Sequence, residues 1–230
     1  MNNLCSIGMR GGSKGVKNKN LKHMHGKPLL SYTIDQARNS GLFDHIVVST
    51  DSEEIQQLAL SLGAEAWFLR PKEMATDEAG KLPVICHTIK ESEEYFSKKF
   101  DVIVDLDVTA PLRTSKDIQE AYKRLIETDS DNLISVCEAR KNPYFNMIEL
   151  VDNKPQLVKV TKNRPVRRQE APRVFDMNAA IFMWQSRCKI DYKNLITDKT
   201  AIFEMPQDRS VDIDSETDWK FVEFMMSIKS

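Results

Sequence analysis

The sequence predicts an α/β fold in which helices cover both faces of a mostly parallel, mixed sheet. Apolar runs of strand length recur at residues 4–9, 45–49, 102–106 and 133–137. Between them lie segments whose apolar residues recur with helical periodicity. Alternation of strands and helices is typical of a three-layer arrangement, since parallel strands need a crossover to connect them.

The first two helices have recognisable ends. Pro28 is expected to open a helix, where a missing N–H costs nothing, and Gly41 to end it. Asp51 or Ser52 is expected to cap the next helix, whose apolar residues repeat at helical spacing. Residues 66–69 are interpreted as a further strand.

The rhythm of strands and helices breaks after Glu138. Residues 139–176 contain four prolines and alternating segments, which favour an inserted arm of extended chain and hairpins. The sheet is expected to resume at residues 179–184. The remaining helices are expected over residues 82–98, after a cap at Ser115, and over residues 217–227.

Composition limits the functions that the chain can have. Its 230 residues carry 33 basic and 34 acidic side chains, a balance that disfavours nucleic acid as a partner. The length suits a single domain over residues 1–230. The four cysteines form no C-x-x-C pair, so a zinc ribbon is not expected. There is neither a signal-peptide pattern nor a run of about 18 apolar residues, so we expect a cytoplasmic protein without a membrane partner.

A glycine-rich, cationic loop over residues 10–20 directly follows the first strand. Its glycines let backbone N–H groups approach an anion, and its cations add charge, which together suit a triphosphate. These residues are Arg10, Gly11, Gly12, Lys14, Gly15, Lys17 and Lys19. The loop lacks the P-loop pattern, and Arg10 replaces the first glycine of the dinucleotide fingerprint. A solvated flexible loop is the alternative interpretation.

An acidic pair near the end of the chain is a candidate metal site. Asp212 and Asp214 are two residues apart, so in extended chain both carboxylates face the same way. One or two carboxylates together with substrate phosphates are the ligands that Mg²⁺ prefers. A solvent-exposed pair or a helix cap is the alternative.

Three further segments carry polar residues that could bind a substrate. Asp105 is a charge in an apolar strand, which is costly without a partner or metal. Arg113 could form a bidentate pair of hydrogen bonds from its guanidinium to a substrate carboxylate. Arg168 and Gln169 could bind an anionic substrate from the arm, or could simply be solvated. Asn178 could bind a sugar hydroxyl or could form a turn.

Together these segments resemble the acylneuraminate cytidylyltransferases, also called CMP-sialic acid synthetases, over nearly the whole chain. The matching motifs are R-G-G-S-K-G from Arg10, V-S-T-D from Val48, Arg70-Pro71, T-A-P-L-R from Thr109, Arg168-Gln169, Asn178 and Asp212-Ile213-Asp214. The resemblance implies a nucleotide-diphospho-sugar-transferase-like sheet with an arm that completes a homodimer. It also implies a reaction between CTP and a nine-carbon α-keto acid sugar that releases pyrophosphate.

The resemblance also implies roles for individual residues. The nucleotide would be held by Arg10, Gly11, Gly12, Ser13, Lys14, Asn20, Arg70, Thr109 and Ala110. The sugar would be held by Asp107, Arg113, Arg168, Gln169 and Asn178. Arg10, Lys14, Lys19 and Asp214 would be catalytic, and Asp212 and Asp214 would bind Mg²⁺.

One departure from the family pattern bears on the substrate. Asp107-Val108 stands where many sialic acid enzymes carry Gln-Pro, and this form looks most like the members that activate N,N′-diacetyllegionaminic acid. Neuraminic, pseudaminic and eight-carbon keto acids remain alternatives. So do two other classes, a non-catalytic nucleotide-sugar binder and an NAD-linked oxidoreductase. The residues leave the general base open, with Asp107 one candidate.

Overall fold

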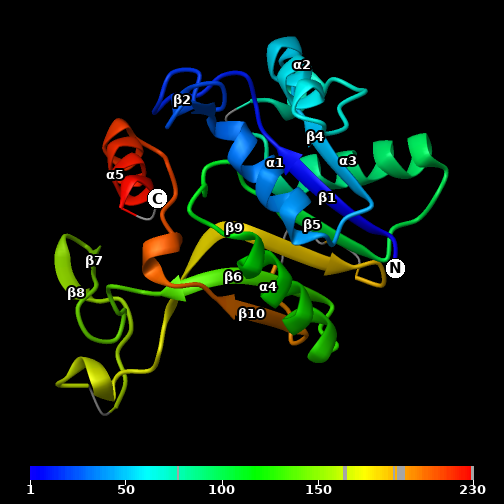
Figure 1. Cartoon of the computed structure of the whole chain (residues 1–230). Helices are drawn as coiled ribbons and strands as arrows, with labels where there is room; N and C mark the ends of the chain where they lie inside the picture. The colour runs from blue at the N-terminus through cyan, green and yellow to red at the C-terminus, as the bar shows by residue number, and fades with distance from the viewer. Residues whose placement is uncertain (77, 163–164, 189, 191–194, 229–230) are drawn as a thin grey trace.

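In the computed structural model, which describes residues 1–76, 78–162, 165–188, 190 and 195–228, six strands form one central sheet (Figure 1). The strands are β1 (Asn3–Gly8), β4 (His45–Ser49), β5 (Val102–Leu106), β6 (Asn132–Glu138), β9 (Phe175–Gln185) and β10 (Thr200–Glu204). Their order is β10-β6-β9-β5-β1-β4. Strand β9 runs antiparallel to β5 and β6, whereas the other neighbouring pairs are parallel. The predicted mixed, mostly parallel sheet is confirmed.

Helices cover both faces of this sheet, as predicted. They are α1 (Leu29–Ser40), α2 (Glu53–Ser61), α3 (Lys81–Phe96), α4 (Ser115–Glu127) and α5 (Glu216–Ser227). The adjacent residues Leu4 and Cys5 of β1 belong to separate apolar clusters, because successive side chains of a strand point to opposite faces. The cluster containing Cys5 includes side chains from α1, α2, α4 and α5, and the cluster containing Leu4 includes Ile85 of α3.

The helix ends follow the predicted chemistry with one change. Pro28 precedes α1, and Gly41 ends it in the left-handed conformation that glycine favours. Ser52 caps α2 by accepting the N–H of Ile55. The cap of α4 is Thr114 rather than Ser115, because Thr114 and Asp117 bond each other's backbone N–H groups in a capping box.

The predicted strand over residues 66–69 is wrong. Only Glu65 pairs with the sheet there, in an isolated bridge to Val47. The run is apolar because its aromatic residues cover α3, and Trp67 stacks on Tyr95 with ring centroids 4.3 Å apart. The carbonyl groups of Ala66 and Phe68 accept hydrogen bonds from the Gln56 side chain instead of from a neighbouring strand.

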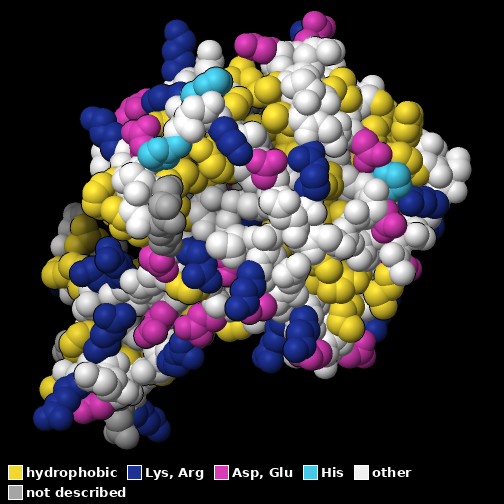
Figure 2. Space-filling view, viewed as in Figure 1, with side chains coloured by type: hydrophobic (Ala, Val, Ile, Leu, Met, Phe, Trp, Pro, Cys, Tyr) yellow, Lys and Arg dark blue, Asp and Glu magenta, His cyan; other side chains and the backbone are white. Residues whose placement is uncertain are grey.

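An arm projects from one end of the sheet after Glu138 (Figure 1). The predicted arm over residues 139–176 is two residues too long, because Phe175 and Asp176 already pair with β6 as the start of β9. The arm contains the hairpin of β7 (Ile148–Val151) and β8 (Lys154–Leu157), followed by the short 3₁₀ helix η2 (Arg168–Glu170). Residues 163–164 of the predicted arm lie outside the described residues. Figure 2 shows Lys and Arg side chains gathered over this projection at the lower left.

Some elements were not expected from the sequence. They are the edge strand β10 and the two-residue strands β2 (His23–Met24) and β3 (Lys27–Pro28). The 3₁₀ helices η1 (Lys72–Met74) and η3 (Gln207–Arg209) are also additions. Within the described part of the chain, no helix has both the length and the apolar character needed to cross a membrane.

Candidate active site

The glycine-rich loop and Asp214 of the acidic pair line the same cavity, at the carboxyl ends of β1 and β5. The cavity has a volume of about 380 Å³. From the loop region it is lined by Gly8, Met9, Arg10, Gly12, Ser13, Lys14, Gly15, Lys19 and Asn20. The other lining residues are Asp107, Val108, Thr109 and Asp214. Most of the predicted nucleotide-binding residues therefore surround one space together with one of the two predicted metal ligands.

Direct contact joins the loop to the acidic segment. A Cβ atom on Gly15 would lie 1.7 Å from the carbonyl oxygen of Asp214, so only glycine allows this approach. Lys19 donates a hydrogen bond to the carbonyl of Ile213, and its Nζ lies 3.9 Å from Oδ1 of Asp214. The two segments are thus held against each other although they lie at opposite ends of the sequence.

Gly11 is placed differently from the prediction. Its N–H donates to Oδ1 of Asp51 at 2.8 Å, and it is absent from the residues that line the cavity. A Cβ atom here would come within 2.9 Å of the Cβ of Ser52. Gly11 therefore fixes the loop to the start of α2, and we assign it a structural role instead of an anion contact.

Internal hydrogen bonds give the rest of the loop its shape. The Ser13 hydroxyl donates to the carbonyl of Val16 and accepts the N–H of Lys19 at 3.1 Å. The buried amide of Asn20 donates to the carbonyl of Arg10 at 3.0 Å. The loop therefore has a defined conformation, which argues against the interpretation as a merely flexible segment.

The carboxylates of the acidic pair differ in environment. The side chain of Asp214 is 81% exposed and lines the cavity. Oδ1 of Asp212 is buried and has no hydrogen-bond partner among the described residues. Burial raises the pKa of the Asp212 carboxyl, and the negative charges of Asp107 and Asp214 raise it further. An orphaned buried oxygen beside an exposed carboxylate fits a divalent cation.

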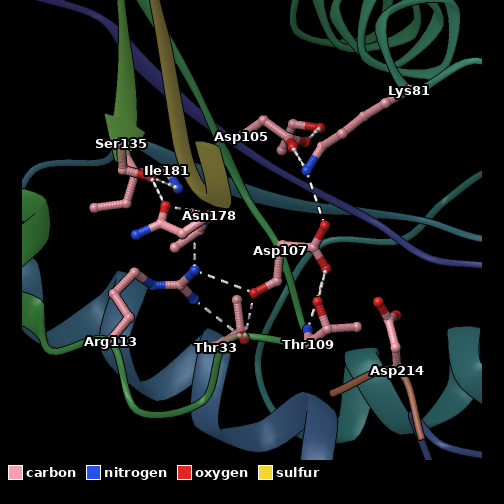
Figure 3. Close-up of polar contacts among 12 residues, drawn as sticks. Thr33, Lys81, Asp105, Asp107, Thr109, Arg113, Ser135, Asn178, Ile181 and Asp214 are labelled. Atoms are coloured by element: carbon pink, nitrogen blue, oxygen red, sulfur yellow. Dashed lines mark hydrogen bonds and ion pairs between the residues drawn. The ribbon is translucent and has the colours of Figure 1, made fainter. Parts of the chain in front are cut away.

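The buried charge of Asp105 has a partner that the sequence did not reveal (Figure 3). Nζ of Lys81 lies 3.1 Å from Oδ2 of Asp105 and 2.9 Å from Oδ2 of Asp107. Lys81 begins α3, far upstream of both aspartates, so no local spacing pointed to it. The one available signal was the cost of an unpaired carboxylate in an apolar strand.

This arrangement makes Asp107 a poor general base. Burial alone would raise its pKa, but the charge and hydrogen bond of Lys81 and the hydrogen bonds from Thr109 lower that pKa to about 2. Oδ1 accepts from both the N–H and the hydroxyl of Thr109, at 3.1 Å and 2.8 Å. A carboxylate with such a low pKa stays ionised near neutral pH and is a weak proton acceptor.

A second cavity of about 280 Å³ adjoins the first. The two share the lining residues Gly8, Arg10 and Asp107, and the second also contains Arg70 and Lys81. Arg70 is buried and donates to the carbonyls of Met9 and Ser49. Burial lowers the pKa of its guanidinium. Arg70, which was predicted to bind the nucleotide, thus lines the same cavity as Arg10 of the loop.

Arg113 is used inside the protein instead of facing a cavity. It is 1% exposed and donates to the carbonyl of Asp107 at 3.1 Å and to the hydroxyl of Thr33 (Figure 3). It also donates to the carbonyl of Ala180 at 2.6 Å and to the side chain of Gln36. Burial lowers the pKa of the guanidinium to about 10. We therefore replace the predicted fork to a substrate carboxylate with a structural role, because its hydrogen-bonding groups are turned toward these internal acceptors.

Asn178 and Ala110 are also buried. The Asn178 amide donates to the Ser210 hydroxyl at 3.0 Å, and its oxygen accepts from the Ser135 hydroxyl at 2.6 Å. Its polar atoms are satisfied inside the protein, so a contact with a sugar hydroxyl is not supported by this geometry. Ala110 is 1% exposed and is absent from the lining of the first cavity.

Arg168 and Gln169 line a different cleft, of about 220 Å³, at the base of the arm. This cleft shares no lining residue with the two cavities beside the loop. Arg168 donates to the carbonyl of Ala139 at 2.9 Å. The chain therefore does not bring the predicted sugar residues of the arm to its own nucleotide cavity.

Comparisons with known proteins confirm the resemblance drawn from the motifs. A protein-family model described as Cytidylyltransferase matches residues 4–226. Two relatives are 44% identical over 227 residues, covering 99% of this chain and 96% of each relative. They are the post-translational flagellin modification protein B of Campylobacter coli and the CMP-N,N′-diacetyllegionaminic acid synthase of Campylobacter jejuni.

A solved structure supports the fold independently. The CMP:2-keto-3-deoxy-manno-octonic acid synthetase complexed with CTP superposes with a TM-score of 0.72 at 14% identity, and the match covers 100% of both chains. At that identity the likeness concerns the fold alone. Because the family model spans almost the entire sequence and both relatives align over nearly their full length, the chain belongs to the cytidylyltransferase family.

Proposed function

We propose that the protein transfers a cytidylyl group from CTP to N,N′-diacetyllegionaminic acid, giving the CMP-sugar and pyrophosphate. The observation that carries this proposal is one cavity that is lined by both the cationic glycine-rich loop and Asp214 of the acidic pair. The choice of sugar is supported by Asp107-Val108 and by the 44% identity to the Campylobacter jejuni protein named as a synthase of that CMP-sugar.

The reaction would be an in-line displacement at the α-phosphorus. The anomeric oxygen of the sugar would form a bond to the α-phosphorus while the bond from phosphorus to the bridging oxygen breaks. Pyrophosphate would leave, and the proton of the anomeric hydroxyl would pass to solvent water. Arg10, Lys14 and Lys19 line the cavity, where they would neutralise the charge that accumulates on the leaving phosphates. Catalysis of this kind depends mainly on positioning and charge, which the contact between loop and acidic segment would supply.

The residues also fit a divalent cation, which we take to be Mg²⁺. Asp212 and Asp214 would hold it, since one offers a buried unpartnered oxygen and the other an exposed carboxylate over the cavity. When bound, such a cation supplies charge neutralisation to the phosphates. Asp107 would remain ionised and orient Thr109 and Lys81, which makes it unsuited to act as the general base.

The nucleoside would occupy the second cavity. Arg10 lines both cavities, so a nucleotide whose phosphates contact the loop could extend past Arg10 toward Arg70. The buried guanidinium of Arg70 is fixed by two backbone carbonyls, which would give a rigid wall for the base.

We also propose that the arm pairs with a second copy of the chain. Ile148 and Leu150 of its hairpin are 67% and 68% exposed, and such apolar side chains are favoured in protein contacts. Arg168 and Gln169 lie in a cleft away from the nucleotide cavity of their own chain. In a homodimer they would reach the sugar only from the arm of the partner, where their charge and amide suit a keto acid carboxylate.

The test is a pyrophosphate-release assay with CTP, Mg²⁺ and a panel of keto acids. We expect the highest kcat/KM with N,N′-diacetyllegionaminic acid. With pseudaminic and N-acetylneuraminic acids, whose ring substituents differ, we expect kcat/KM to be lower by about tenfold or more. ATP, GTP and UTP in place of CTP test the choice of base. Binding of CTP without pyrophosphate release from any acid would instead support a non-catalytic nucleotide-sugar binder.

A further inference from the structure

Lys81 lies at the second cavity but belongs to none of the motifs that predicted the site. It lines the second cavity and contacts Asp107, which lines both. Its side chain is 35% exposed, whereas that of Asp105 is 2% exposed. Its Nζ also lies 4.7 Å from the centre of the Phe182 ring, so the ammonium is held by an aromatic face as well as by two carboxylates.

A continuous line of hydrogen bonds runs from Lys81 to the acidic pair. Lys81 donates to Asp107, and the other carboxylate oxygen of Asp107 accepts both the N–H and the hydroxyl of Thr109 (Figure 3). The carbonyl of Thr109 then accepts the N–H of Ile213 at 2.9 Å. Ile213 is the residue between Asp212 and Asp214, and it is fully buried.

We propose that Lys81 is a positioning residue of the transfer site, acting through Asp107 and Thr109 on the segment that carries Asp212 and Asp214. It touches neither carboxylate of that pair directly, so it is not a catalytic residue. Its ammonium fixes the rotamer of Asp107, Asp107 fixes the turn at Thr109, and Thr109 fixes the backbone at Ile213. This role rests on the proposed function, in which Asp212 and Asp214 hold a divalent cation.

The sign of one measurement separates positioning from simple electrostatics. Replacing Lys81 by an uncharged residue removes a positive charge near the acidic pair, and this alone would strengthen the binding of a cation. Loss of positioning would do the opposite, because the two carboxylates would no longer be held in a productive geometry. Weaker binding in such a variant therefore cannot come from the lost charge.

The experiment measures Mn²⁺ binding to the nucleotide-free full chain, by the electron paramagnetic resonance signal of free Mn²⁺. We expect Lys81→Met to bind Mn²⁺ about tenfold more weakly, and Lys81→Arg to recover part of the loss. The matched control is Lys90→Met on the same helix, whose side chain is 70% exposed and pairs only with Glu94 among the ion pairs of the described residues. It should stay within about twofold of the wild type.

A second pair of variants keeps the test decisive if Lys81→Met does not fold. Thr109→Val removes the hydroxyl and should weaken Mn²⁺ binding about threefold, whereas Thr109→Ser keeps the hydroxyl and should stay closer to the wild type. Unchanged or tighter binding in folded Lys81→Met, or equal affinities for the two Thr109 variants, would overturn the proposal. Failure of the proposed function would appear separately, as wild-type protein that binds Mn²⁺ and CTP but releases no pyrophosphate.

Discussion

Gly15→Ala tests the contact that joins the glycine-rich loop to the acidic segment. The new Cβ atom would lie 1.7 Å from the carbonyl oxygen of Asp214 and 2.9 Å from its carbonyl carbon, whereas ordinary contacts begin at 3.4 Å. The obstacle is backbone, so no side chain can rotate away. The two segments must therefore separate by roughly 1.7 Å, which is the difference between the 3.4 Å of an ordinary contact and the 1.7 Å to the carbonyl oxygen.

That separation should be costly for both catalysis and folding. Misplacement by about 1 Å can reduce a rate by about 100-fold, so we expect kcat/KM to fall by about 100-fold or more, which is about 2.7 kcal/mol of transition-state stabilisation. The cost in stability should be about 1–3 kcal/mol, as for other overpacked sites. Pyrophosphate-release kinetics with CTP and the keto acid, together with thermal unfolding, measure both effects.

Gly12→Ala is the comparison for this variant. Gly12 lies in the same loop, but a Cβ atom there would meet nothing within 4 Å. It should therefore preserve the contact between Gly15 and Asp214 and lose much less activity than Gly15→Ala. Wild-type kcat/KM in a folded Gly15→Ala protein would refute the reasoning, since the contact could then be broken without consequence.

Three further substitutions test other parts of the site and fold. Asp214→Asn should reduce kcat by about 100-fold or more in the pyrophosphate assay and leave the melting temperature nearly unchanged, because this side chain is 81% exposed. Asp117→Asn should reduce the free energy of unfolding near neutral pH by about 2 kcal/mol, since Arg209 contacts both carboxylate oxygens at 2.7 Å and 3.0 Å. Burial alone would raise the pKa of Asp117, but the hydrogen bonds from Arg209 and from Thr114 lower it in the folded protein. The stability that this group adds to the wild type is therefore complete above about pH 4 and is lost as pH falls through the lower, folded-state pKa. The variant should lack that acid-induced loss in urea denaturation series. Arg113→Met should reduce the free energy of unfolding by about 3 kcal/mol, because it leaves buried carbonyls unsatisfied. A large rise in KM for the keto acid, with stability unchanged, would restore the substrate contact for Arg113.

The fold could be predicted well where the signal is local. The strands at residues 45–49 and 102–106 have the predicted bounds, because an apolar run between polar turns suffices to mark a buried strand. Gly41 ended its helix as expected for the same reason. The run at residues 66–69 was wrong, since an apolar segment that covers a helix has the same composition as a buried strand.

The site was predictable in its parts but not in its connections. The order of loop and strand indicated which sheet edge would carry Arg10 and Asp107, because residues that follow parallel strands collect at one edge. The partner of Asp105 was not predictable, since Lys81 reaches it only through the packing of α3. Arg113 was misplaced because an arginine beside a cavity and an arginine buried behind it look alike in sequence.

In the proposed function, the glycine-rich loop and the acidic pair close around one nucleotide and one cation. The most direct test is a crystal structure of the protein with CTP and Mn²⁺, in which anomalous scattering locates the metal. We expect the metal at Asp212 and Asp214, and the triphosphate against the loop from Arg10 to Lys19. A triphosphate bound away from this loop, or a metal remote from both Asp212 and Asp214, would contradict the account.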